Sequence, residues 1–300
     1  MDNIVSAEQL KNDLINIGVK PGDILHLKVS MRAIGKIEGG AEAFVNILLD
    51  VVGEEGTIVS DAFISSYPLP FSSEDAKKIS NSNTPSYAGA FANAMIKHPL
   101  SYRSKHPIQK FVAIGKYAEK LTENHTEKSN GYDLIKDMIK LDGKNLTIGK
   151  TVVGVGTTHI AVEEKGFKRA SINKGVNFID ENGNTKLFKI NWNGGCGNGF
   201  PKFIPLYYEK NGVIADGEIG NANGLLTSLK KTLQIEIDKL SEDSRFFFCD
   251  NLSCYSCQIS WEHSPKNYIK FYFHWLKKNY KGLSIKRFVV IFKSIFLKND

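Results

Sequence analysis

Short apolar segments alternate with amphipathic segments along the first half of the chain. The runs DILHLKVS (23–30), GTIVSDAF (56–63), FVAIG (111–115) and NLTIG (145–149) are typical of buried strands. Apolar residues at helical spacing predict helices in AEQLKNDLINIG (7–18), GGAEAFVNILLDVVG (39–53), PSYAGAFANAMIK (85–97) and YDLIKDMIKL (132–141). This alternation predicts an α/β fold, a three-layer α/β/α arrangement around a central mixed or parallel sheet.

The second half of the chain changes character twice. The stretch FKRASINKGVNFIDENGNTKLFKINW indicates antiparallel hairpins with Glu-Asn-Gly-Asn as turn material, so we expect a small antiparallel β subdomain inserted at about 166–216. A glycine-broken turn then leads into a helix that ends near residue 240. We therefore expect one domain over 1–240 and an appended aromatic, basic, helical extension over 241–300.

Charge is concentrated at the carboxyl end. The net charge of +7 arises after residue 264, where nine Lys or Arg side chains face one acidic residue, while the other 264 residues carry 30 basic and 31 acidic side chains. A near-neutral body argues against a general nucleic-acid-binding surface. No apolar run reaches the roughly eighteen residues of a spanning helix, and the amino terminus lacks a secretory pattern, so the expected location is the cytoplasm.

The cysteines leave two interpretations open. Cys249, Cys254, Cys257 and His263 form C-x4-C-x2-C-x5-H, a ligand set that zinc accepts. The irregular spacing and the lack of a second CxxC favour buried thiols, so no metal is expected. Cys196 lies in NWNGGCGNGFPKF (191–203), where no local feature would lower its thiol pKa, and this stretch is interpreted as a loop of close backbone approach rather than a nucleophile site.

Two stretches carry residues suited to anions. Gly39 and Gly40 open a helix after the loop that contains Lys28, Ser30 and Arg32, so the helix start either binds a phosphate or only forms a turn and cap. Thr84 is a good N-cap residue with Pro85 at the first helical position. Further on, Arg103, Ser104, Lys105 and His106 crowd together before Pro107, either as an anion site or as a solvated basic loop.

The segment GVGTTHIAVEE (154–164) contains the strongest candidate for proton transfer. Thr157 or Thr158 can cap a helix that begins near His159, and a histidine in a first turn has a lowered pKa and stays neutral at pH 7. Glu163 lies four residues on, along the same face, and can orient the ring. The alternative is a polar histidine at a helix start with no catalytic role.

Taken together and in order, these stretches resemble the aminoglycoside 3-N-acetyltransferase family. The landmarks are IGVKPGD, VSMRAIG followed by GGAEA, TPSYAGAFANAM, RSKHP followed by FVAIG, LDGKNLTIG, the TTH segment, and GVIADGEIGNANGLL, covering about residues 5–240. The last sixty residues carry no such likeness. The resemblance implies a three-layer domain with a small antiparallel subdomain that moves an acetyl or larger acyl group from coenzyme A (CoA) to a primary amine of an amino sugar.

The resemblance also implies roles for individual residues. His159 is similar to the family's general base, with Thr157 as a hydroxyl near the oxyanion and Glu163 as the displaced orienting carboxylate. Val153 and Val162 stand where the family carries acidic residues. The candidate acyl-CoA contacts are Lys28, Val29, Ser30, Met31, Arg32, Thr84, Arg103, Ser104 and His106.

The acceptor follows from charge. A polycationic antibiotic favours an acidic cleft. Because valines replace acidic residues of the family near His159, we expect an anionic acceptor, a nucleotide-linked amino sugar used in surface polysaccharide synthesis. The alternatives are an aminoglycoside antibiotic and, in another class, a catalytically inactive membrane-attached scaffold. The stripe of Ile285, Phe288, Phe292, Ile295 and Phe296 predicts a helix within 265–300 that lies on an anionic membrane or docks on the body or a twin subunit.

Overall fold

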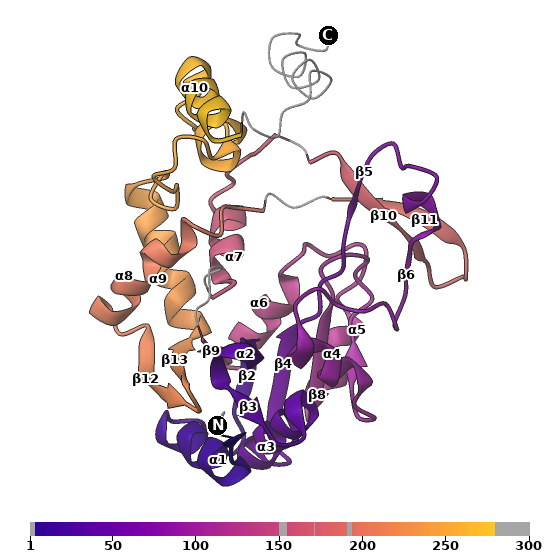
Figure 1. Cartoon of the computed structure of the whole chain (residues 1–300), viewed down its shortest axis with the longest axis vertical. Coiled ribbons are helices and arrows are strands. Elements are labelled where there is room, and N and C mark those ends of the chain that lie inside the picture. Colours follow the sequence, from indigo (N-terminus) through magenta and orange to yellow (C-terminus); the bar gives the residue numbers. More distant parts are fainter. Residues whose placement is uncertain (1–3, 150–154, 171, 191–193, 280–300) are drawn as a thin grey trace.

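A mixed sheet forms the centre of the molecule (Figure 1). The computed structural model describes residues 4–149, 155–170, 172–190 and 194–279. Within this part the main sheet has the strand order β12-β13-β9-β2-β4-β8-β7. Its strands are β2 (Ile24–Val29), β4 (Thr57–Asp61), β7 (Tyr102–Arg103), β8 (Phe111–Gly115), β9 (Lys144–Ile148), β12 (Val213–Ile219) and β13 (Ala222–Ser228).

The strand directions explain where polar residues gather. β2 pairs in parallel with both β4 and β9, whereas the other pairs in this sheet are antiparallel. Val29 and Asp61 are therefore the last residues of neighbouring parallel strands, and both lie at the carboxyl ends of these strands, on the same side of the sheet. The predicted mixed sheet is confirmed, and the four strands expected from apolar runs are all present.

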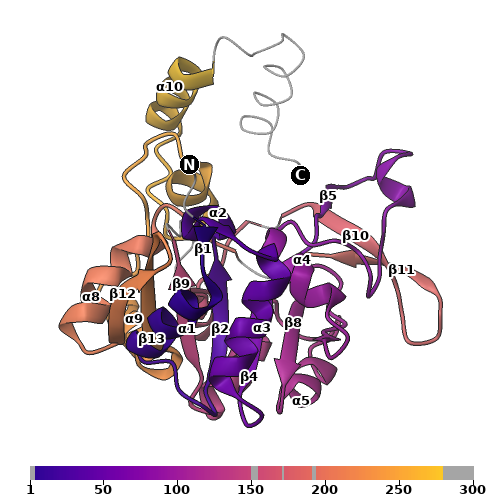
Figure 2. The same ribbon diagram turned by 60° about the horizontal axis from the view of Figure 1, so that its bottom comes forward.

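Helices cover both faces of the sheet (Figures 1 and 2). Alternate residues of one strand enter different cores: Ile58 packs with α1, α3 and α4, and Val59 packs with α5, α6, α7 and α9. This confirms the three-layer α/β/α arrangement. The helices are α1 (Ala7–Asn16), α2 (Met31–Ile34), α3 (Gly40–Val52), α4 (Ala90–Lys97), α5 (Ala118–Glu123), α6 (Asp133–Lys140), α7 (Thr157–Glu164), α8 (Ile204–Glu209), α9 (Leu229–Glu242) and α10 (Tyr268–Asn279), with short turns of other helix types at Asp75–Lys77, Phe200–Phe203 and Ser256–Ser260.

A second, small sheet contains the predicted hairpin. β10 (Lys174–Ile179) and β11 (Thr185–Lys189) pair antiparallel, and β10 also pairs with β5 (Tyr67–Pro68) and β6 (Ile79–Ser80). The expected insertion at 166–216 is wrong in its extent, because β5 and β6 come from the loop after β4 and residues 213–216 belong to β12 of the main sheet. A further short parallel pair joins β1 (Ile4–Val5) to β3 (Lys36–Ile37).

One predicted helix start is wrong. α4 begins at Ala90 with Gly89 as its N-cap, five residues after the predicted first residue, Pro85. Thr84 instead accepts a hydrogen bond from the Asn81 N–H in the preceding loop, at 3.0 Å. Asn93 holds the intervening segment: its Oδ1 accepts from the Ser86 N–H at 2.9 Å, so residues 84–89 stay non-helical.

The described part of the extension packs against the body. Phe247, Phe248, Cys249, Cys257 and Trp261 are buried in the same core as α6, α7 and α9. α10 follows at one end of the molecule (Figure 1). The domain division at residue 241 stays a prediction, and this segment contributes to the hydrophobic core on the face of the sheet that α6, α7 and α9 cover.

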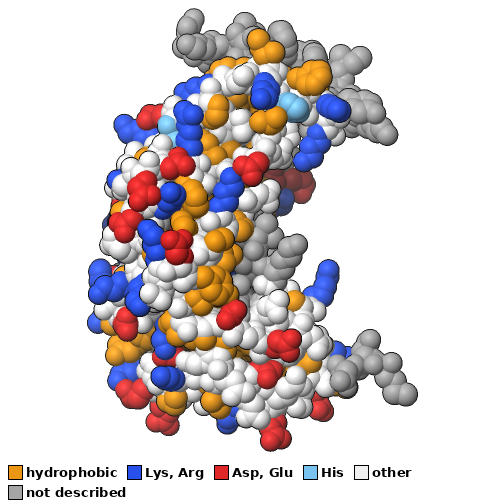
Figure 3. All heavy atoms as spheres, turned by 90° about the vertical axis from the view of Figure 1, so that its left-hand side faces the viewer, with side chains coloured by type: hydrophobic (Ala, Val, Ile, Leu, Met, Phe, Trp, Pro, Cys, Tyr) orange, Lys and Arg blue, Asp and Glu red, His pale blue; other side chains and the backbone are white. Residues whose placement is uncertain are grey.

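The face that carries α8, α9 and α10 is mixed in charge. Figure 3 shows acidic and basic side chains interspersed over it, with hydrophobic side chains exposed toward the end where α10 lies. Ile269 and Phe273 of α10 are 85% and 67% exposed. Among the described residues, no helix combines the length and apolar character needed to cross a bilayer. The predicted stripe at 285–296 lies outside the described residues.

Candidate active site

A cavity of about 480 Å³ opens where the parallel strands β2 and β4 end. This is the place at which open α/β sheets gather ligands, because loops and helix starts surround the carboxyl ends of the strands. The cavity combines an aromatic wall with a few polar groups, a composition typical of small-molecule sites. It is lined by Leu27, Lys28, Val29, Ser30, Ser60, Asp61, Phe63, Tyr87, Ala88, Phe91, Ala92, Gln109, Tyr132, His159, Gly195, Gly197 and Phe200.

A carboxylate holds the polar floor of the cavity together. Asp61 Oδ1 lies 2.9 Å from His26 Nε2, and Asp61 Oδ2 lies 3.4 Å from Lys28 Nζ. The other ring nitrogen of His26 lies 3.0 Å from Asn145 Oδ1. Burial alone would raise the pKa of Asp61, but Lys28 and His26 outweigh it and hold that pKa well below its usual range. Asp61 is therefore ionised and paired at neutral pH.

His159 is the third residue of α7, and its side chain faces the cavity. Its ring stacks on Tyr132 with centroids 4.0 Å apart and meets the edge of Phe200 at 5.0 Å. Burial, with a smaller contribution from Lys28, lowers the pKa of His159 to about 3, and Asp61 opposes this shift. The Nδ1 atom is enclosed and has no hydrogen-bond partner among the described residues. The imidazole is thus neutral at pH 7 and held by aromatic contact, with a lone pair available for a proton.

Glycine allows α7 to approach the Asp61 cluster. The N-cap of α7 is Gly156, with φ +101°, a conformation that side chains rarely adopt. A Cβ there would lie 3.0 Å from Ile135 Cδ1 and 3.5 Å from His26 Cε1. The predicted threonine cap is wrong, because Gly156 caps the helix without a side-chain hydrogen bond.

The two threonines instead fasten α7 to α9. Thr157 Oγ1 donates to Thr232 Oγ1 at 3.3 Å, and Thr158 Oγ1 donates to Glu236 Oε1 at 2.5 Å. The hydroxyl of Tyr207 also donates to Glu236 Oε1. Burial raises the pKa of Glu236 to about 7. Thr157 is fully buried and is not among the residues that line the cavity, so its expected role near the oxyanion stays a prediction.

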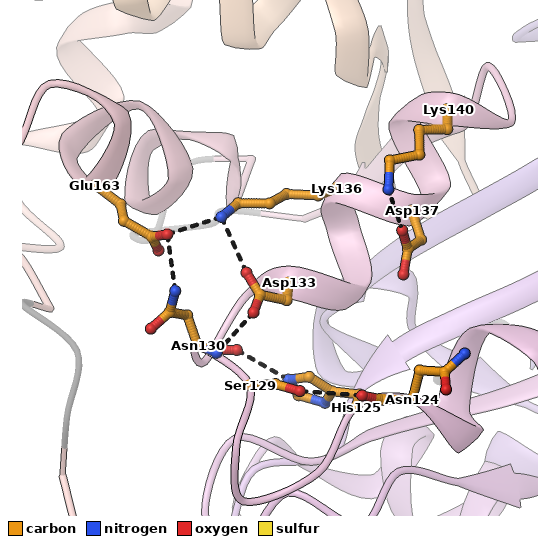
Figure 4. Close-up of polar contacts among 9 residues, drawn as sticks. All are labelled: Asn124, His125, Ser129, Asn130, Asp133, Lys136, Asp137, Lys140 and Glu163. Carbon is orange, nitrogen blue, oxygen red and sulfur yellow. Dashed lines mark hydrogen bonds and ion pairs between the residues drawn. The ribbon is translucent and has the colours of Figure 1, made fainter.

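Glu163 does not orient His159. Its carboxylate accepts from Lys136 Nζ at 2.7 Å and from Asn130 Nδ2 at 2.8 Å, and Lys136 also pairs with Asp133. Figure 4 shows the side chain turned toward these residues, which belong to α6 and the loop before it. The expected orienting role is corrected: Glu163 ties α7 to α6, and stacking on Tyr132 orients the imidazole.

The candidate coenzyme contacts fall into separate groups. Lys28, Val29 and Ser30 line the cavity together with His159, and the Ser30 side chain also caps α2. Met31 is half-buried against the core, and Arg32 is exposed on α2. Gly39 caps α3 in a left-handed conformation and does not line the cavity, in agreement with the turn-and-cap interpretation.

The basic loop lies elsewhere. Arg103 and Ser104 line a different cavity of about 300 Å³, together with Lys105 and Lys110. The Arg103 guanidinium donates to three backbone carbonyls, those of Ala62, Ser82 and Thr84, so it holds the loops and is largely occupied. The structure therefore does not bring Thr84, Arg103 or Ser104 to the cavity of His159.

His106 is an interior histidine. It is fully buried, its Nδ1 accepts from the N–H groups of Ile108 and Gln109, and its ring stacks on His125. Burial, with smaller contributions from His125 and Lys110, lowers the pKa of His106 to about 2. The expectation that His106 contacts a coenzyme phosphate is corrected, since a neutral buried ring cannot do so.

This environment predicts acid sensitivity. The unfolded chain takes up a proton at His106 below pH 6.5 and the folded chain does not, so stability falls as pH drops from 6.5 toward 2. His106→Asn keeps an acceptor for the two N–H groups and has no such proton uptake. We expect wild type to lose about 2 kcal/mol more unfolding free energy than His106→Asn between pH 7 and pH 5. Urea unfolding of both proteins at both pH values measures the difference, and equal losses would contradict the account.

Sequence reasoning missed Asp61, Tyr132, Phe200 and Glu236. The sequence contains a signal for Asp61, because this carboxylate stands at the end of an apolar strand. It also contains a signal for Glu236, because this residue interrupts the apolar stripe of α9. The aromatic pair around His159 comes from segments far apart in the sequence, and no local pattern indicates that they meet.

A family model described as aminoglycoside 3-N-acetyltransferase matches residues 26–241. The chain belongs to this family. Among curated relatives, the aminoglycoside N(3)-acetyltransferase III of Salmonella sp is 31% identical over 162 residues, which are 48% of this chain and 56% of that protein. The aminoglycoside N(3')-acetyltransferase-like protein YokD of Bacillus subtilis is 31% identical over 136 residues, 40% of this chain and 50% of that protein. The chain thus spans about half the length of the curated relatives it matches.

Solved structures share the fold of this family member. AAC-VIa bound to sisomicin superposes with a TM-score of 0.70 at 22% identity, covering 80% of this chain and 99% of that one. AAC-IIIb in its binary complex with CoASH gives a TM-score of 0.68 at 18% identity, covering 80% and 97%. Of the two departures from the acidic residues of the family, Val162 belongs to α7 and is packed in the core, and Val153 lies outside the described residues.

Proposed function

We propose that this chain is a CoA-dependent N-acetyltransferase that acetylates an amino group of an aminoglycoside, with His159 as general base. One observation carries the proposal: the neutral imidazole of His159 faces a 480 Å³ cavity at the carboxyl ends of β2 and β4. Family membership supports the reaction class. Several curated relatives are named as aminoglycoside N(3)-acetyltransferases, and these names support the acceptor.

The chemistry explains the need for a neutral base. A sugar amine is mostly ammonium at pH 7, and only its neutral form has the lone pair that attacks a thioester. As the C–N bond forms, the attacking nitrogen becomes positively charged and His159 accepts a proton from it. The tetrahedral intermediate then breaks its C–S bond, and CoA leaves as a thiolate that takes up a proton. The negative charge that develops beside His159 raises the proton affinity of the ring during the reaction, so a ground-state pKa of about 3 is compatible with this role.

The acyl donor belongs against the end of β2. Lys28, Val29 and Ser30 line the cavity with His159, so a thioester at that strand end faces the imidazole without further rearrangement. The proposed donor is acetyl-CoA or another acyl-CoA. The proposed mechanism is direct transfer within a ternary complex, which needs no acyl-enzyme.

A second acceptor stays in consideration on one observation. Lys28 neutralises Asp61, and these are the two charged residues that line the cavity, so the described site has no excess of negative charge. This favours the nucleotide-linked amino sugar expected from the sequence over a polycation. The comparisons support the aminoglycoside, which we therefore place first. Membrane contact through 265–300, a homodimer and a scaffold role stay predictions.

A thiol-release assay tests the proposal. The full chain is incubated with acetyl-CoA and either aminoglycosides or nucleotide-linked amino sugars, and free CoA is followed. We expect acceptor-dependent release with aminoglycosides. If CoA is released only with nucleotide-linked amino sugars, these and not aminoglycosides are the acceptors. If the protein binds CoA but releases none with any amine tested, the result favours the scaffold role.

A further inference from the structure

Four cysteines converge outside the candidate active site. Cys196 lies in the glycine-rich loop, 53 residues before Cys249, and Cys254 and Cys257 follow within the extension. The sulfur atoms of all four lie within 4.8 Å of one another, and the Cys196 and Cys254 sulfurs are 3.7 Å apart. All four are free thiols, and all but Cys254 are buried. The sequence pattern did not include Cys196, because its spacing from the other three is not local.

We propose that Cys196, Cys249, Cys254 and Cys257 bind one structural zinc ion. Four thiolates at 2.3 Å from a common tetrahedral centre lie about 3.8 Å from one another, close to the separation of Cys196 and Cys254. Soft thiolate ligands in a tetrahedral set select zinc or iron, and four protein ligands leave no position open for catalysis. Binding deprotonates the four thiols and releases their protons to solvent.

The surroundings suit a negatively charged metal–thiolate group. The backbone N–H of Cys249 donates to Cys257 Sγ at 3.2 Å, a hydrogen bond of the kind that orients metal ligands. Arg169 interacts electrostatically with Cys196, Cys254 and Cys257. Its Nε donates to Ser260 Oγ at 2.8 Å, and its guanidinium lies over the Trp261 ring, so this cation is fixed beside the sulfurs. Zn²⁺ with four thiolates carries two negative charges, which a neighbouring guanidinium stabilises.

His263, the fourth residue of the sequence pattern, is not a ligand in this arrangement. Its Nε2 pairs with the Ser244 carbonyl oxygen at 3.0 Å, and its ring stacks on Phe248. The described cluster therefore assigns the fourth position to Cys196. The two ligand sets differ only in their fourth ligand, Cys196 or His263, so substitution of each residue can distinguish them.

The site would fasten the extension to the wall of the cavity. Gly195 and Gly197 flank Cys196 and line the cavity, and Phe200 contacts His159. The two segments approach so closely that a Cβ at Gly199 would lie 1.9 Å from the Phe247 carbonyl oxygen. A metal that bridges Cys196 to Cys249, Cys254 and Cys257 holds this contact in place, and the zinc acts on the active site only through the loop.

Metal analysis of the full chain tests the proposal. Protein purified from zinc-supplemented cells without chelator should carry about one zinc per chain, and Co²⁺ exchanged into it should give the intense visible bands of tetrahedral cobalt thiolate. Cys196→Ser and Cys254→Ser should lose the zinc, and a strong chelator should lower the Tm of wild type. His263→Ala is the matched control and should keep its zinc.

Several outcomes would overturn the site. They are four titratable thiols with no metal, disulfides among these cysteines in freshly isolated protein, iron in place of zinc, or loss of zinc from His263→Ala together with retention in Cys196→Ser. If Cys196→Ser fails to fold, the metal content of wild type and of His263→Ala still decides. None of these readouts depends on acetyl transfer, so the proposed function stands or fails separately.

Discussion

Replacing His159 with asparagine should lower kcat by about 10²–10⁴-fold and leave the Kd for CoA unchanged. The imidazole is neutral and faces the cavity, and an amide of similar size occupies the same space without accepting a proton from an ammonium group. Steady-state kinetics with saturating acetyl-CoA and acceptor measure kcat, and isothermal titration measures CoA binding. Circular dichroism verifies the fold of the variant.

Glu163→Gln provides the matched control for this prediction. The residue lies on the same helix, one turn after His159, and its carboxylate bonds Lys136 and Asn130 rather than the imidazole (Figure 4). Its kcat should stay close to wild type. A large loss of kcat in Glu163→Gln with normal turnover in His159→Asn would reverse both assignments.

Asp61→Ala should destabilise the protein by about 3 kcal/mol, since it leaves the buried His26 and the partly buried Lys28 without their shared carboxylate. For a chain of this size we expect the Tm to fall by roughly 5–10 °C. Because the pKa of Asp61 is held well below its usual range, its stabilising charge is lost only in strong acid, and the difference from wild type should persist at pH 5. Thermal unfolding by calorimetry at pH 7 and pH 5 measures it.

Two further variants interpret the Asp61 result. Asp61→Asn keeps an acceptor for His26 and should lose less stability than Asp61→Ala. Glu55→Ala removes the exposed ion pair with Lys116 and should not change the Tm measurably, because solvent screens such pairs. If Asp61→Ala unfolded at the same temperature as Glu55→Ala, the buried cluster would not have the stabilising role inferred from its geometry.

The sequence predicts the main layers of the fold well because their signals are local. The strands around Leu25, Ile58, Val112 and Leu146 are apolar runs bounded by turns, and α1, α3 and α6 carry a single buried stripe. Alternate burial on the two faces of the sheet follows from this pattern alone. The predicted start of α4 was wrong because the Asn93 side chain accepts a hydrogen bond from the Ser86 N–H. This contact spans seven residues, and a cap pattern does not reveal it.

Long-range contacts account for what sequence reasoning missed in the candidate site. His159 could be chosen from its helix start, but its contacts with Tyr132 and Phe200 depend on how three distant segments pack. Glu163 was expected on helical spacing, which places it on the face of the helix but does not determine its partner. Cys196 joins Cys249, Cys254 and Cys257 only because the glycine-rich loop packs against the extension.

The most direct test of the central claim is a crystal structure of the ternary complex with CoA and an aminoglycoside. The account predicts that the CoA sulfur lies in the cavity at the end of β2 and that the acceptor nitrogen lies between this sulfur and His159. The acceptor nitrogen should be within about 3 Å of an imidazole nitrogen. A coenzyme thiol bound at the Arg103 cavity, or an acceptor amine beyond the reach of His159, would contradict it.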